Sequence, residues 1–117
     1  MFLGCNYQDH YRETKEGTAV TVVADKKDHP ILTGVTGFTS PGSLYKVMPL
    51  APTAQALMVG KIEGQDAEPV LMTNTYINNG RIVYTSLGHP GDFEIPAFRR
   101  MLVNATFWAL GLDVPKE

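Results

Sequence analysis

The sequence predicts a mixed α/β domain, and three observations support this fold class. Several short runs are rich in β-branched and apolar residues. Two of these runs flank Asn78-Asn79-Gly80, and residues 96–111 repeat apolar side chains at helical spacing. The 117 residues suffice for one domain with a modest core. We therefore expect several strands and one C-terminal helix.

The first strands are predicted from local composition. Residues 18–24 and 54–62 are apolar and rich in strand-forming types, and residues 44–47 form a shorter apolar patch. Residues 1–5 look like the end of a strand, whereas residues 6–17 are polar and aromatic without a period. We expect a loop over residues 6–17 and strands after it.

A β-hairpin is the clearest local prediction. Residues 69–77 and 81–87 are β-rich, and Asn78-Asn79-Gly80 separates them. An Asn-Gly pair favours a type I′ turn, because both central residues of that turn need positive φ. We expect the two runs to pair as neighbouring antiparallel strands.

The C-terminal helix is predicted over residues 96–111. Pro96 suits its first turn, and Gly111 supplies a stop signal. Apolar residues recur at i, i+3, i+4 and i+7 and form one continuous face of Phe98, Met101, Leu102, Ala105, Trp108, Ala109 and Leu112. Asn104 is expected to point away from this face. Because one helix covers one face of a sheet, we expect a second copy of the chain or a missing half of the domain to cover the other.

The overall composition excludes several classes of function. The net charge is −2 and no cluster of Lys and Arg occurs, so we expect no nucleic-acid partner. No apolar run approaches the ~20 residues that cross a bilayer, and the start lacks the pattern of a secretory signal. We expect a cytoplasmic protein with no membrane partner. The single cysteine, Cys5, excludes an internal disulfide and is expected to be buried and inert.

His89 is the first candidate for a catalytic residue. It follows a predicted strand, and ligands of open α/β sheets bind outside the carboxyl ends of strands. A neutral imidazole can ligate a metal or transfer protons near neutral pH. Asp92 and Glu94 lie beside it and could orient the imidazole or act as acid and base. The alternatives are that His89 bonds loop backbone and that the acids cap the helix.

The polar and aromatic segment around His10 is the second candidate. Tyr7 and His10 have the composition of a sugar-binding loop, because aromatic faces stack on sugar C–H surfaces and polar groups bond hydroxyls. The alternative is a disordered N-terminal segment. His29 precedes Pro30, which favours a structural turn. A divalent metal such as zinc could use His10, His29 and His89, although no close ligand spacing supports this.

The most distinctive stretch of the chain is residues 80–111, which read GRIVYTSLGHPGDFEIPAFRRMLVNATFWALG. This stretch is similar to the C-terminal signature of the ThuA-like family, the trehalose-utilisation proteins. Asp28-His29-Pro30-Ile31, Leu44-Tyr45 and Glu68-Pro69-Val70 match in order, although Ser43 stands where an acid is common in the family. The resemblance implies a single ThuA-like domain over residues 1–117 that lacks an N-terminal βαβ half. It also implies part of a flavodoxin-like sheet, as in class I glutamine amidotransferases.

The resemblance further implies a role in carbohydrate metabolism. The protein would bind or convert a sugar or keto-sugar, and hydrolysis and isomerisation both suit a site of histidine and carboxylate groups. His89 and Asp92 are the expected catalytic residues of such a hydrolase or isomerase. The expected substrate-binding residues are Tyr7, His10, Tyr45 and Glu94. The alternative is a non-catalytic binding or assembly module, or a fragment, that dimerises through its under-covered sheet face.

Overall fold

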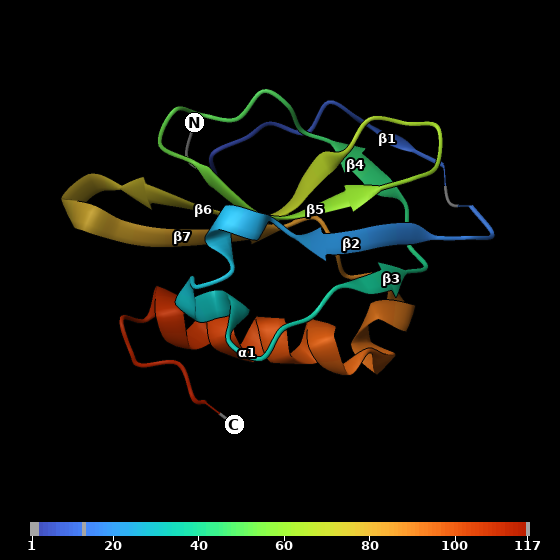
Figure 1. The fold of residues 1–117 in the computed structure, drawn as a ribbon. Coiled ribbons are helices and arrows are strands. Elements are labelled where there is room, and N and C mark those ends of the chain that lie inside the picture. The colour runs from blue at the N-terminus through green and yellow to red at the C-terminus, as the bar shows by residue number, and fades with distance from the viewer. Residues whose placement is uncertain (1–2, 13, 117) are drawn as a thin grey trace.

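The structure is a computed structural model, and it describes residues 3–12 and 14–116. Its centre is a five-stranded sheet in the order β3-β2-β5-β6-β7. These strands are β2 (Thr18–Val22), β3 (Phe38–Ser40), β5 (Gln55–Lys61), β6 (Glu68–Tyr76) and β7 (Gly80–Thr85). The helix α1 (Pro96–Ala109) lies along one side of the sheet (Figure 1). The expected α/β fold with a hairpin and a C-terminal helix is confirmed.

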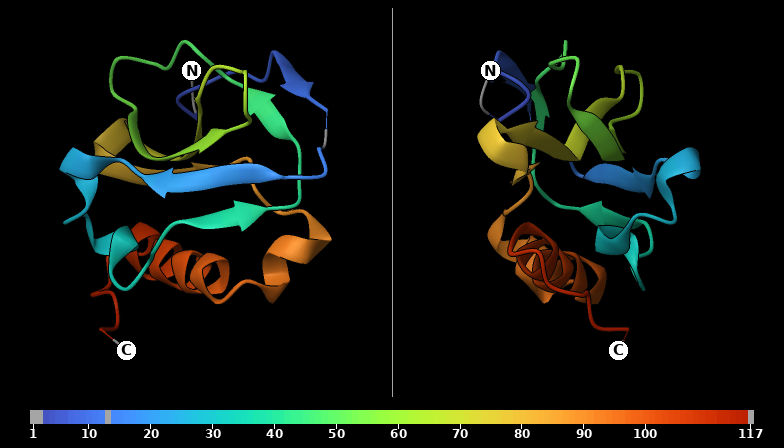
Figure 2. Two further views of the ribbon diagram at one scale, coloured as in Figure 1. Left: turned by 45° about the vertical axis from the view of Figure 1, so that its right-hand side comes forward. Right: turned by 90° about the vertical axis from the view of Figure 1, so that its left-hand side faces the viewer.

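A small two-stranded ribbon lies on the side of the sheet away from α1 (Figures 1 and 2). It pairs β1 (Asp9–Tyr11) with β4 (Leu44–Lys46). The expected strand at 44–47 is confirmed, but the loop predicted over 6–17 contains β1, and β3 was not predicted. Both missed strands have three residues and form through distant pairing, which leaves no local period. Residues 1 and 2 of the expected first strand lie outside the described residues, and residues 3–5 form a bend.

Every strand pair among the described residues is antiparallel. Parallel neighbours need a crossover of a dozen or more residues, usually through a helix. The one long helix described follows the last strand, so it provides no crossover between strands. The parallel strands of a flavodoxin-like sheet and the N-terminal βαβ half therefore stay predictions.

The predicted hairpin joins β6 to β7, with Tyr76 opposite Gly80. Asn78 and Asn79 have the positive φ values, 62° and 61°, and Gly80 begins the next strand. The turn is therefore centred one residue earlier than the Asn-Gly pair suggested. Asparagine tolerates this backbone region better than most residues, which explains the shift.

The helix ends as its sequence predicts. Gly111 has φ of 75°, and its N–H donates to the carbonyl of Trp108 at 3.0 Å. The N–H of Leu112 donates to Phe107 at 2.9 Å, which completes a Schellman motif. Phe98 and Met101 are buried against the sheet, as expected from the apolar face.

Asn104 does not point away from the core and is fully buried. Its side-chain amide donates to the carbonyls of Ile31 and Thr33, both at 2.8 Å. These carbonyls belong to the turn around η2 (Pro30–Leu32) and its C-terminal flank. Helical spacing places Asn104 one turn from Met101, so its position, rather than its polarity, identifies it as a core residue.

The face of the sheet opposite α1 carries a second, smaller core. Cys5, Val47 and Met72 are buried together there, and Tyr45, Leu50 and Tyr84 pack against them. Part of this face is therefore covered by the chain's own segments. Cys5 is 4% exposed, and burial raises the pKa of its thiol. The expected burial of this cysteine is confirmed, and its inertness stays a prediction. No helix among the described residues is long and apolar enough to span a membrane.

Candidate functional site

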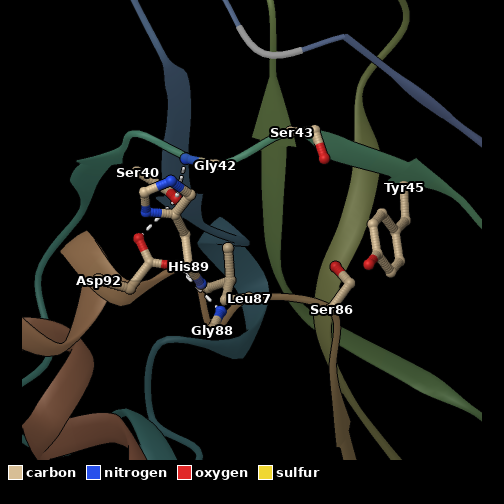
Figure 3. Close-up of a pocket in the computed structure, with 9 residues that line it drawn as sticks. All are labelled: Ser40, Gly42, Ser43, Tyr45, Ser86, Leu87, Gly88, His89 and Asp92. Carbon is tan, nitrogen blue, oxygen red and sulfur yellow. Dashed lines mark hydrogen bonds between the residues drawn. The ribbon is translucent and has the colours of Figure 1, made fainter.

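A cavity of about 290 Å³ lies between the β3–β4 connection and the segment that joins β7 to α1 (Figure 3). The residues lining it are Ser40, Gly42, Ser43, Tyr45, Ser86, Leu87, Gly88, His89 and Asp92. Alternate strands of an antiparallel sheet run in the same direction, so β3 and β7 end at the same end of the sheet. The cavity lies at that end, and we call it the β3/β7 pocket.

Two glycines let the walls of the β3/β7 pocket approach one another. A Cβ atom on Gly42 would lie 3.0 Å from the Cβ of His89. A Cβ atom on Gly91 would lie 2.6 Å from the ring of Pro41. Contacts this short exclude a larger side chain unless a loop shifts. The two loops therefore touch because each presents a glycine to the other.

Asp92 ties the two walls together. Its side chain is 0% exposed, and its Oδ1 accepts a hydrogen bond of 2.6 Å from the Ser40 hydroxyl. Its Oδ2 accepts from the backbone N–H groups of Gly88 at 2.9 Å and His89 at 3.0 Å. The Ser40 oxygen also accepts from the N–H of Gly42 at 3.1 Å. Three donors around one carboxylate favour the capping role for Asp92; its catalytic role stays a prediction.

His89 caps the short helix η4 (Pro90–Glu94). Its Nδ1 accepts a hydrogen bond of 2.9 Å from the N–H of Gly91. Since Nδ1 is the acceptor, the neutral ring carries its proton on Nε2. Asp92 accepts in return from the His89 backbone, which makes a reciprocal capping box. His89 therefore lines the pocket with a fixed ring and a defined tautomer.

His29 makes the same cap at a different place. Its Nδ1 accepts from the N–H of Ile31 at 3.1 Å, and Pro30 follows it as Pro90 follows His89. Its ring lies 5.1 Å from the ring of Trp108. The structural turn expected at His29 is therefore present, and His29 does not line the β3/β7 pocket.

Acid should weaken the fold through His29. Burial, helped by the positive charges of Arg81 and Lys26, lowers the pKa of His29 from 6.5. Below pH 6.5 the unfolded chain takes up a proton that the folded protein resists, so the free energy of unfolding should fall as the pH drops. His29→Asn offers an oxygen in place of Nδ1 and does not titrate. Urea unfolding at several pH values between 8 and 5 gives the free energy of unfolding at each pH. This free energy should fall less steeply with decreasing pH for the variant than for wild type. An equally steep fall in both proteins would contradict the assignment to His29.

Tyr7, His10 and Tyr45 gather beside the pocket. The centroid of the Tyr45 ring lies 5.0 Å from that of Tyr7 and 6.1 Å from that of His10. His10 lies near Tyr45 because the ribbon register places the two residues directly opposite each other. The Tyr7 hydroxyl and Nδ1 of His10 form a hydrogen bond of 3.2 Å. Tyr45 also lines the β3/β7 pocket. Glu94 is exposed and does not line it.

The serines of the pocket were missed by the sequence analysis. Ser43 and Ser86 present hydroxyl groups that can donate and accept hydrogen bonds, whereas the Ser40 hydroxyl already donates to Asp92 and accepts from Gly42. Ser40 ends β3, Ser43 lies in the β3–β4 connection and Ser86 follows β7, and residues at such strand ends carry functional groups on a rigid scaffold. That position is the signal that could have found them.

A metal site gains no support from the side chains that the structure places. Within residues 3–12 and 14–116, no group of three or more His, Cys, Asp or Glu could hold a metal ion. The carboxylate of Asp92 already accepts from three donors, and His29 lies against Trp108. A zinc site at His10, His29 and His89 stays a prediction.

The fold and the pocket define a small α/β protein with a polar, serine-rich cavity at one end of a curled antiparallel sheet. Residues 1–109 match the family model of ThuA, described as trehalose utilisation. The chain therefore belongs to the ThuA family, as its motifs indicated, and this membership implies a part in carbohydrate metabolism. A search of curated proteins gives no match.

Proposed function

We propose that the β3/β7 pocket binds a sugar or keto-sugar and that the protein converts it by hydrolysis or isomerisation. The observation that carries this proposal is the convergence of Tyr45, the hydroxyls of Ser43 and Ser86, and His89 on one cavity. Sugar hydroxyls need partners that both donate and accept, which serines provide, and an aromatic ring packs against sugar C–H groups. The volume of about 290 Å³ is at the lower end of small-molecule sites, roughly 300–1,000 Å³.

His89 would act through its Nε2–H. The bond from Gly91 holds the ring and keeps the proton on Nε2, so the neutral ring donates from that atom. A donor aimed at the oxygen of a keto-sugar stabilises the negative charge that develops there during isomerisation. Asp92 would be a positioning residue, since it accepts from the His89 backbone and anchors the loop.

A sugar-binding module without turnover is the second candidate. Among the described residues, the titratable groups that line the pocket are Tyr45, His89 and Asp92. Because Asp92 is buried and accepts from three donors, a reaction that needs both an acid and a base would depend on Tyr45 beside His89. Binding and turnover therefore have to be measured separately.

Replacing Tyr45 by phenylalanine should weaken sugar binding without unfolding the protein. The change removes one hydroxyl from the pocket, and one hydrogen bond contributes ~0.5–1.5 kcal/mol, or roughly two- to tenfold in Kd. NMR titration with glucose, trehalose and a keto-glucoside measures the affinities. Tyr76→Phe removes a hydroxyl from an exposed tyrosine outside the pocket and is the matched control. Shifts that avoid the pocket, or equal affinities for both variants, would count against the proposal.

His89→Asn separates conversion from binding. The asparagine oxygen replaces Nδ1 as the cap acceptor, whereas the Nε2–H is lost. If His89 stabilises a developing oxyanion, turnover should fall on the order of 10²–10³-fold while the fold is kept. Product formation followed by NMR is the readout. Wild-type protein that binds a sugar and never converts it would establish the binding module instead.

A further inference from the structure

The candidate site has a recessed part and an open part, and Tyr45 belongs to both. The recessed part is the β3/β7 pocket. The open part consists of Tyr7 and His10, which contact Tyr45 but do not line the pocket. We name Tyr7, His10 and Tyr45 the aromatic platform. A ligand that fills the pocket and extends past Tyr45 meets the aromatic platform next.

The aromatic platform is built in advance of any ligand. Tyr7 leaves 55% of its surface exposed, yet its ring meets Tyr45 edge to face at an angle of 71°. Its hydroxyl is held by Nδ1 of His10, and Oδ1 of Asp9 accepts from the His10 N–H at 2.8 Å. An aromatic ring that is already held loses little freedom when a second ring packs on it.

We propose that Tyr7 selects glycosides whose aglycone is itself a ring, with the sugar in the pocket and the aglycone ring on the platform. This inference rests on the proposed function, because it needs the sugar in the β3/β7 pocket. A cavity of about 290 Å³ at the lower end of small-molecule sites suits one ring and leaves a linked ring outside. The exposed face of Tyr7 offers ring packing rather than a set of hydroxyl partners. The platform therefore accepts an aromatic aglycone as well as a second sugar.

The test compares two glucosides of the same anomer, phenyl glucoside and methyl glucoside. Both place glucose in the pocket, but only the phenyl group reaches the platform. Wild type should bind phenyl glucoside roughly two- to tenfold more tightly, as one aromatic pair allows. Tyr7→Ala should remove this preference, so that the variant binds phenyl glucoside and methyl glucoside with the same affinity. Tyr7→Phe keeps the ring and should keep most of the preference.

Tyr76→Ala is the matched control, because Tyr76 is 49% exposed and lies at the hairpin end of β6. It should retain the wild-type preference. Equal affinities of wild type for the two glucosides, or a preference that survives Tyr7→Ala, would overturn this inference while the proposed function stands. If wild type binds neither glucoside nor any other sugar, the proposed function fails and this inference fails with it.

Discussion

Asp92→Ala should lower the free energy of unfolding by on the order of 3–5 kcal/mol. The carboxylate is fully buried and accepts from the Ser40 hydroxyl and from two backbone N–H groups. Alanine leaves the buried Ser40 hydroxyl and the partly buried N–H groups of Gly88 and His89 without their acceptor, which costs more than the loss of a single bond. Urea unfolding of both proteins at one pH measures the difference.

The neighbouring acid provides the control for Asp92. Glu94 is exposed in the same short helix, so Glu94→Ala should change the free energy of unfolding by no more than about 0.5 kcal/mol. Asp92→Asn adds a second comparison, because it keeps the shape but replaces one acceptor oxygen with a donor group. If Asp92→Ala were as stable as Glu94→Ala, the carboxylate would not anchor the loop.

Phe98→Ala should cost ~3–5 kcal/mol of the free energy of unfolding. Phe98 is 1% exposed, and its ring lies 6.4 Å from Phe38 and 5.1 Å from Phe93, both edge to face. It therefore joins α1 to β3 and to η4, the two elements that carry the walls of the pocket. Alanine removes these contacts and leaves a cavity behind them. Chemical unfolding gives the size of the effect.

Val103→Ala is the matched change on the exposed side of the same helix. Val103 is 46% exposed, and alanine is the better helix former, so stability should stay within about 0.5 kcal/mol of wild type. Phe98→Ala should also weaken sugar binding, because the pocket walls lose their common support. If Phe98→Ala were as stable as Val103→Ala, the contacts of Phe98 with Phe38 and Phe93 would not contribute to the stability of the fold.

The elements that were predicted are those that local sequence determines. Pro96, Gly111 and the apolar repeat between them define α1 through capping and periodicity. The hairpin follows from two β-rich runs around a turn of asparagines. In the ribbon, β4 was predicted and β1 was not. The two strands pair residues more than thirty positions apart, such as His10 and Tyr45, so no local pattern marks β1.

The candidate site divides in the same way. His89 and Tyr45 were identified because motifs marked them, and both line the pocket. Ser40 was not identified, because its importance comes from a contact with Asp92 in a distant part of the chain. His29 and His89 are each followed by proline and make the same kind of cap. Only the tertiary structure shows that His89 lines the pocket and His29 does not.

The hydrogen bond between Ser40 and Asp92 joins positions 52 residues apart. It fastens the end of β3 to the loop before α1, so the two walls of the pocket face each other only in the folded chain. A ligand held between the two walls therefore binds only the completely folded chain. Such a ligand at a hundred times Kd would add ~2.7 kcal/mol to the free energy of unfolding. It would stabilise both walls of the pocket together rather than one loop.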